Sequence, residues 1–102
     1  MVDKSKPIII WDKAAKAQLR KAYNRIKKES LQGAETVKNG ILESVDEIPE
    51  EPYRYPPDKF KKDNPGNYRA FEKYNYRIAY KVTEENIQVL RVRHVKREPL
   101  DY

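Results

Sequence analysis

The sequence contains no cysteine and one histidine among its 102 residues. The absence of cysteine excludes a disulfide framework and a thiolate metal site, and one histidine excludes a metal site built from several histidines. No apolar run approaches the roughly 20 residues that a membrane-spanning helix needs. The opening residues, MVDKSKPIII, lack the apolar segment of a signal peptide. We therefore expect one cytoplasmic domain, residues 1–102, with no membrane segment, metal or cofactor.

Charged residues are abundant and unevenly distributed, and the net charge is +6. Residues 1–28 carry nine Lys/Arg against two Asp/Glu, residues 29–57 two against seven, and residues 58–102 eleven against seven. A basic balance favours polyanionic partners such as nucleic acid, the ribosome or an acidic protein segment. For the first segment, a solvated lysine-rich helix face is an equally good interpretation.

The first half predicts one strand and two helices. Residues 1–6 form a polar leader, and we expect the apolar run Pro7–Trp11 to be an edge strand because proline starts it. Asp12 is a good N-cap for a helix over Lys13–Lys28, whose apolar residues recur on one stripe. A second stripe predicts a helix from Leu31 or Ala34 to Val45 or Asp46, and the short connection predicts an antiparallel helical hairpin.

Two local features qualify this pattern. Gly40 lies in the middle of the second predicted helix, where glycine costs about 1 kcal/mol relative to alanine. We therefore expect another element to approach closely there. Residues 49–66, PEEPYRYPPDKFKKDNPG, hold five of the seven prolines and predict an ordered surface loop rather than a helix or central strand.

The last third predicts three strands, at Tyr68–Lys73, Tyr76–Val82 and Ile87–His94. Runs of β-branched and aromatic residues with short polar connections are typical of hairpins. The predicted fold is therefore α+β: an antiparallel sheet, made of this three-strand meander and the N-terminal edge strand, packed against the helical hairpin. One face of the sheet is covered by helices and the other is open.

Cations occupy the strands of this sheet. Alternation in the middle strand predicts that Arg77 and Lys81 face away from the helices. Both alternating sets of the last strand contain apolar residues, so the pattern leaves open whether His94 lies beside Arg77. If it does, Arg77, His94, Lys96 and Arg97 form a compact cationic pocket that could bind a phosphate.

Several motifs occur together in one order. A Trp-Asp pair starts a basic helix, a second amphipathic helix and a proline-containing loop follow, and the strands read Tyr-Arg-Ala-Phe, Asn-Tyr-Arg-Ile-Ala-Tyr-Lys-Val and Val-Leu-Arg-Val-Arg-His-Val-Lys-Arg-Glu-Pro. Over nearly its whole length the chain resembles the RelE/ParE family of bacterial type II toxins. The resemblance implies a cognate antitoxin, encoded by an adjacent gene, that wraps and neutralises the toxin. RelE-like members cut mRNA in the ribosomal A site, whereas ParE-like members share the fold but poison DNA gyrase.

The resemblance also implies a set of site residues. Arg77 matches a phosphate-binding arginine, Arg97 matches an active-site arginine after the last strand, and His94 could be an acid/base group. We take these three as candidate catalytic residues, and Arg69, Lys81, Lys96 and Tyr102 as candidate phosphate or RNA contacts. The structural alternatives are a salt bridge from Arg77 to Glu72 or Glu98, a hydrogen-bonding role for His94, and a frayed terminus at Tyr102, which we favour for that residue.

One departure from the family pattern separates the functional hypotheses. RelE has two lysines on the strand before Tyr-Arg, where this chain has Tyr68 and Ala70. The first hypothesis is an endoribonuclease (an mRNA interferase) that inhibits translation by ribosome-dependent mRNA cleavage, through attack of a 2′-hydroxyl on the adjacent phosphate. The second, which the missing lysines favour, is a non-catalytic inhibitor of DNA gyrase. The third is a degenerate member that binds only its antitoxin or RNA.

Overall fold

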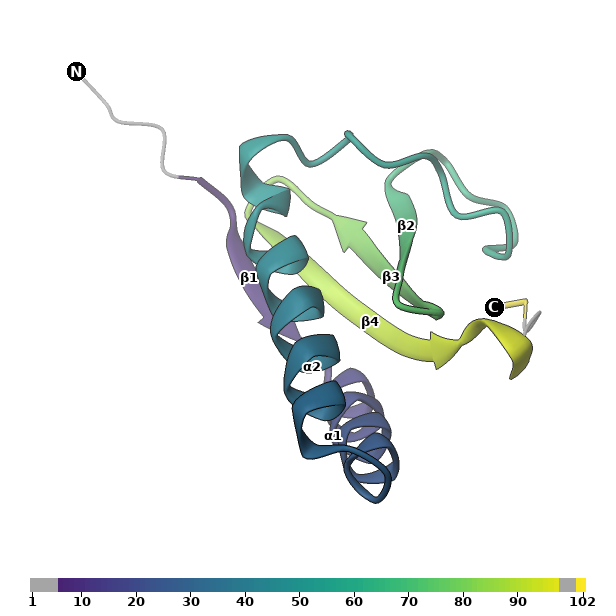
Figure 1. The fold of residues 1–102 in the computed structure, drawn as a ribbon. Coiled ribbons are helices and arrows are strands. Elements are labelled where there is room, and N and C mark those ends of the chain that lie inside the picture. The colour runs from purple at the N-terminus through teal and green to yellow at the C-terminus, as the bar shows by residue number, and fades with distance from the viewer. Residues whose placement is uncertain (1–5, 98–100) are drawn as a thin grey trace.

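The computed structural model describes residues 6–97 and 101–102, so most of the polar leader lies outside it. The sheet has four strands and lies beside a helical hairpin (Figure 1), which confirms the α+β prediction. The elements in order are β1 (Ile8–Trp11), α1 (Lys13–Lys27), α2 (Leu31–Asp46), η1 (Ile48–Glu50), β2 (Tyr68–Lys73), β3 (Tyr76–Val82), β4 (Asn86–His94) and η2 (Val95–Arg97). None of the described helices is both long and apolar enough to cross a membrane.

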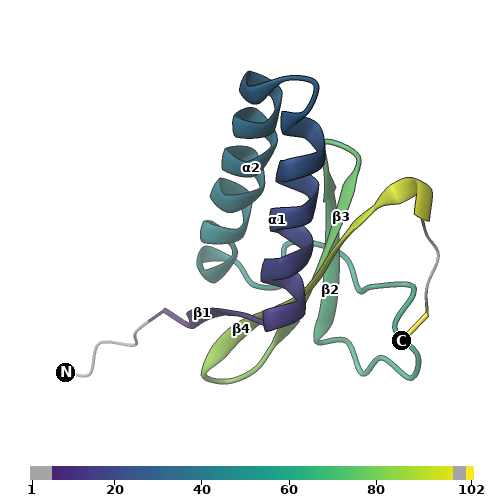
Figure 2. The same cartoon turned by 90° about the horizontal axis from the view of Figure 1, so that it is seen from below.

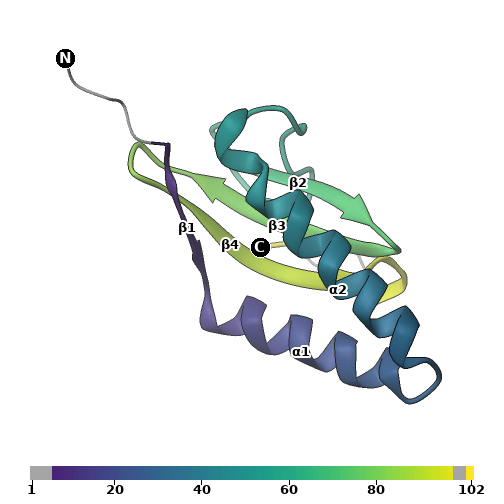
Figure 3. The same ribbon diagram turned by 60° about the vertical axis from the view of Figure 1, so that its left-hand side comes forward.

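The strand order in the sheet is β1-β4-β3-β2. Strands β2, β3 and β4 form the predicted antiparallel meander. Strand β1 adds to the edge of β4, as Figure 3 shows, but it runs parallel to β4, with Ile8 opposite Asn86 and Trp11 opposite Val89. The sheet is therefore mixed rather than antiparallel throughout. The helical hairpin, the loop and strands β2 and β3 all lie between β1 and β4 in the chain, and together they supply the long crossover that parallel pairing requires.

Both helices cover one face of the sheet, and the loop after η1 and the end of the chain lie toward the other (Figure 2). The predicted alternation in β3 is confirmed, because Ile78 and Tyr80 are fully buried with Ile41 and Val45 of α2. The buried hydroxyl of Tyr80 donates a hydrogen bond to the Pro52 carbonyl at 2.9 Å. The helix-covered face therefore holds the core.

A β-bulge in β4 explains why its facing was ambiguous in the sequence. Tyr80 of β3 pairs with Val89, and Ala79 pairs with Arg91, so Leu90 is an extra residue. A bulge shifts the side-chain alternation of a strand by one residue. Val89 and, beyond the bulge, Val92 are consequently both buried on the helix-covered face.

The close approach expected at Gly40 is confirmed. A Cβ atom at this position would lie 2.4 Å from Cε2 of Tyr74, which occupies the β2–β3 turn. The Tyr74 side chain is otherwise exposed, and Tyr74 and Asn75 both have positive φ, at 52° and 69°. The turn therefore brings a ring against α2 where only glycine leaves room for it.

This contact predicts that the stability effect of Gly40→Ala depends on Tyr74. Alanine should add up to about 1 kcal/mol through helix propensity, but in the wild-type background displacement of the ring should cancel that gain. With Tyr74→Asn, which tolerates positive φ, the full gain should appear in urea unfolding. Equal effects of Gly40→Ala in the two backgrounds would contradict the contact.

Candidate functional site

Arg77 lies on the sheet face away from the helices, as the alternation predicted, but it is not open to solvent. Its Nη2 donates to Oδ1 of Asp58 at 2.9 Å and its Nη1 to Oε2 of Glu72 at 3.2 Å. The guanidinium also lies 4.8 Å from the centre of the Phe60 ring. The side chains of Arg77 and Asp58 are only 12% and 1% exposed. The predicted salt bridge to Glu72 is thus present, and Arg77 also forms a shorter ion pair with the buried Asp58. Glu98 lies outside the described residues.

Asp58, from the proline-rich loop, is the centre of this arrangement. Oδ1 also accepts from the Phe60 N–H at 3.1 Å, and Oδ2 accepts from the Tyr102 hydroxyl at 2.7 Å. Burial alone would raise the pKa of Asp58, but the hydrogen bonds from Tyr102, Arg77 and Phe60 and the charge of Arg77 outweigh burial and lower it. Asp58 is therefore an ionised, fully partnered carboxylate that joins the loop to the sheet.

Tyr102 is held in place, so the frayed terminus favoured from the sequence is wrong. Its main chain pairs with the loop, because its N–H donates to the Phe60 carbonyl at 3.0 Å and its carbonyl accepts from the Lys62 N–H at 2.9 Å. The Arg91 guanidinium lies 4.2 Å from its ring centre, and the Tyr68 ring meets it edge-on at 6.2 Å. The face that sequence analysis expected to be open is therefore covered by the loop and Tyr102.

His94 lies on the opposite face from Arg77. It pairs with Tyr76, which faces the helices, and the two rings meet edge-on at 5.1 Å. The bulge at Leu90 is the reason, since without it His94 would share the face of Arg77. The single pocket that sequence analysis considered for Arg77, His94, Lys96 and Arg97 does not form.

His94 nevertheless has a defined protonation state. Its Nδ1 accepts a hydrogen bond from the Lys96 N–H at 3.1 Å, so the neutral ring carries its proton on Nε2. Burial, followed by the charges of Arg25, Lys96 and Arg97, lowers the pKa of His94. The neutral ring therefore offers a hydrogen-bond donor at Nε2, and its Nδ1 lone pair is engaged by the Lys96 N–H.

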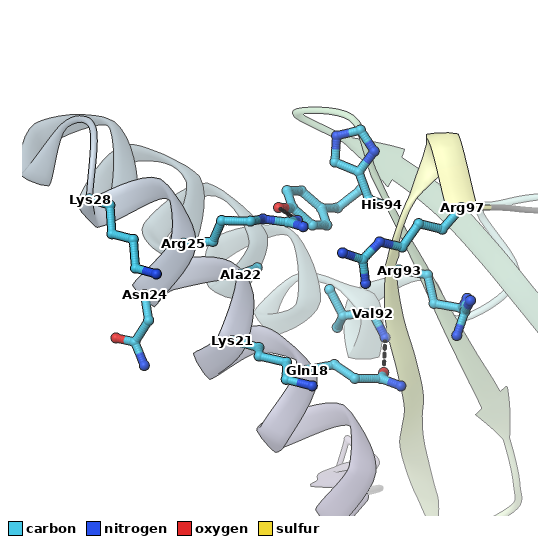
Figure 4. A pocket seen from close by; sticks show the side chains of 11 residues that line it. Gln18, Lys21, Ala22, Asn24, Arg25, Lys28, Val92, Arg93, His94 and Arg97 are labelled. Atoms are coloured by element: carbon cyan, nitrogen blue, oxygen red, sulfur yellow. Dashed lines mark hydrogen bonds between the residues drawn. The ribbon is translucent and has the colours of Figure 1, made fainter.

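His94 borders a cleft of about 510 Å³ between α1 and the end of β4 (Figure 4). Within residues 6–97 and 101–102, its lining contains no aspartate or glutamate. The cationic residues of the lining are Lys21, Arg25, Lys28, Arg93 and Arg97. Arg25 is fixed by donating to the Tyr76 hydroxyl at 2.9 Å, and Gln18 accepts from the Val92 N–H at 2.7 Å, which ties α1 to the part of β4 beyond β1. The cleft is thus a cationic depression with a rigid wall.

The seven candidate site residues fall into separate places. His94 and Arg97 border the cleft, and Lys96 is adjacent to them. Arg77, Lys81 and Tyr102 lie on the opposite face, where the Lys81 ammonium is 5.3 Å from the Tyr68 ring centre. Arg69 lies at the β2 edge and donates to the carbonyls of Gly66 and Tyr55 at 2.8 and 2.7 Å, so it holds the loop.

Asp58 and the contribution of α1 to the cleft were not predicted from the sequence. The spacing of Lys21, Arg25 and Lys28 is a helical stripe that could have been recognised, whereas nothing in the loop composition distinguishes Asp58 from the surrounding charged residues. Across residues 6–97 and 101–102, no group of three or more His, Asp or Glu side chains could hold a metal ion.

Comparisons with known proteins agree with this fold. The family model described as "ParE toxin of type II toxin-antitoxin system, parDE" matches residues 9–99. A solved structure of the chromosomal ParDE system from P. aeruginosa is similar, with a TM-score of 0.70, 19% identity, and coverage of 88% of this chain and 97% of that chain. A YoeB dimer structure from Staphylococcus aureus has a TM-score of 0.56, 15% identity, and coverage of 87% and 97%. No curated protein sequence matches the chain.

Proposed function

The chain belongs to the ParE toxin family of type II toxin–antitoxin systems, and we propose that it inhibits DNA gyrase by binding and does not cleave RNA. The observation that carries the proposal is the separation of the candidate catalytic residues. Arg77 is held by the buried Asp58 on one face, while His94 and Arg97 border a cleft on the other. Cleavage by a 2′-hydroxyl needs a base, an acid and phosphate-binding cations around one phosphate.

The electrostatics of the two sites support the same proposal. The Asp58 carboxylate neutralises the guanidinium of Arg77 and lies between it and Tyr102. At His94, Nδ1 is engaged and the lowered pKa favours the neutral ring with its proton on Nε2, so no free lone pair is presented to a ribose hydroxyl. Among the described residues, neither face brings an unengaged general base together with Arg77 or Arg97.

Ribosome-dependent mRNA cleavage is the second candidate function. It is favoured by one observation, which is that His94 lies beside Arg97 and Arg25 in a cleft able to take a phosphate. In that case the protonated, imidazolium form of His94 would act as the general acid through Nε2–H, and another group would have to supply the base. The cognate antitoxin is the partner expected for either function.

The proposal predicts the outcome of induced expression without the antitoxin. Purified toxin should inhibit supercoiling by gyrase, and mapped mRNA ends in the expressing cells should show no codon-phased cuts. Co-expression of the neighbouring antitoxin gene should restore growth, which serves as the control for specific toxicity. Codon-phased cuts that disappear in His94→Ala or Arg97→Ala, with supercoiling unaffected by the wild-type toxin, would establish the second candidate instead.

A further inference from the structure

We propose that the cleft between α1 and the end of β4 binds the phosphodiester backbone of a nucleic-acid strand. The inference concerns the isolated toxin and goes beyond the proposed function, because it does not depend on which target the toxin inhibits. It rests on the arrangement of the cations, on the absence of acidic residues from the described lining of the cleft, and on the hydrogen bond that His94 accepts.

One wall of the cleft is a row of cations. Lys21 and Arg25 on α1 and Lys28 at its C-cap follow each other at helical spacing, and all three line the cleft. At about 1.5 Å per residue the row extends roughly 10 Å along the helix. A linear row of positive charges matches a linear polyanion, as in the grooves that follow a nucleic-acid backbone.

No acidic residue of the described part of the chain lines the cleft beside this row. Helix α1 contains no aspartate or glutamate in its 15 residues. An ordinary solvated helix face carries charges of both signs. Across the cleft, Arg97 extends from η2 toward Arg25 (Figure 4), so two guanidinium groups converge, and none of the described lining residues is a carboxylate. Bringing like charges together is unfavourable, and an anion between them would offset that cost.

Two groups of the cleft, Arg25 and His94, are positioned before any ligand arrives. The buried Tyr76 holds Arg25 through its hydroxyl at 2.9 Å, and its ring packs against His94. The Nε2–H of the neutral His94 ring is a hydrogen-bond donor. The guanidinium groups of Arg25 and Arg97 are planar and can donate paired hydrogen bonds to phosphate oxygens. Prepositioned groups lose less conformational entropy on binding.

Phosphodiester fits these features better than an acidic protein segment does. The lining has more cationic residues than one carboxylate side chain can neutralise. These residues are spread along the cleft and do not surround a single point. Consecutive phosphates carry a charge at every unit of a strand, whereas carboxylates in a helical segment recur less often. An acidic peptide is therefore the competing occupant in the test.

The test is fluorescence anisotropy with a labelled short oligothymidylate, a short DNA duplex and an oligo-glutamate peptide, each titrated with full-length protein over a range of salt concentrations. The cleft variant is Lys21→Gln/Lys28→Gln/Arg97→Gln. Its matched control, Lys13→Gln/Lys27→Gln/Lys59→Gln, removes the same charge from exposed lysines outside the cleft lining. The cleft variant should bind DNA on the order of tenfold more weakly, with a salt slope smaller by about 2, and the control should bind nearly as wild type.

Equal losses in the two variants would overturn the proposal, because affinity would then follow net charge alone. Tighter binding of the peptide than of either DNA, lost in the cleft variant, would assign the cleft to an acidic protein partner instead.

The single histidine of the sequence supplies an independent readout by NMR. Oligonucleotide should shift the His94 ring resonances and raise the pKa of His94, because a bound anion opposes the fields of Arg25 and Arg97. If the His94 ring resonances do not shift while DNA binding saturates, the DNA binds outside the cleft.

Discussion

Replacing Asp58 with asparagine should lower the free energy of unfolding by about 3 kcal/mol, because removing one partner of a buried ion pair strands the other charge. Asp58 is the only charged residue among the fully buried side chains of the described core. Its two oxygens accept from Arg77, Phe60 and Tyr102. Asparagine keeps the size but loses the charge and at least one of these acceptors. Urea unfolding followed by circular dichroism measures the difference.

Glu72→Gln is the matched control, since Glu72 bonds to the same guanidinium but its side chain is 57% exposed. An exposed partner is worth about 0.5 kcal/mol or less. Comparable losses in the free energy of unfolding from both substitutions would mean that the buried ion pair with Asp58 stabilises the fold no more than the exposed ion pair with Glu72 does.

Acid should produce the same effect as the Asp58 substitution. The pKa of Asp58 is lowered in the folded state, so its contribution is complete above the unfolded value of about 3.9 and is lost as the pH falls through the folded value. The difference in stability between wild type and Asp58→Asn should therefore shrink in acid. A difference that does not change with pH would contradict an ionised Asp58.

The sequence was sufficient for the elements and for the layers, because hydrophobic periodicity directly reports which side of a helix or strand is buried. The helix pair, the three-strand meander and the inward face of β3 were all predicted. The direction of β1 was not, because a short apolar strand at an edge reads the same in either orientation. The bulge at Leu90 was also out of reach, since a bulge adds one residue without a required residue type.

The site was harder to predict for the same physical reasons. The facing of His94 depends on the Leu90 bulge, so one unrecognised residue moved it to the other side of the sheet. Arg77 was placed on the correct face, but its partner Asp58 comes from a loop whose path no periodicity encodes. A family motif identifies residues that can bind phosphate; whether they are free to do so depends on such contacts.

Tyr102 provides the second large effect, and its hydroxyl and ring can be separated. Tyr102→Phe removes the hydrogen bond to the buried carboxylate of Asp58, and should cost about 1.5–3 kcal/mol because the acceptor is charged. Tyr102→Ala also removes the ring that packs between Arg91 and Tyr68, and should bring the loss to about 3–4 kcal/mol. The loss should be seen in urea unfolding.

A double-mutant cycle shows whether Tyr102 and Asp58 act as a unit. Tyr102→Phe should cost at least about 1 kcal/mol less in the Asp58→Asn background than in wild type. Additive losses would mean that the hydroxyl and the carboxylate contribute independently.

Alkaline pH tests the hydroxyl in a different way. Burial and Asp58 raise the pKa of Tyr102, so its contribution is complete below the unfolded value of about 10 and is lost as the pH rises toward the folded value. Burial also raises the pKa of Tyr80, to about 12, so the wild type should lose stability in alkali through both groups. Tyr102→Phe should lose less stability in alkali than the wild type does.

The oligonucleotide affinity of Tyr102→Phe should be unchanged, because Tyr102 lies on the face opposite the cleft. Weaker binding would show that the covered face takes part in recognition.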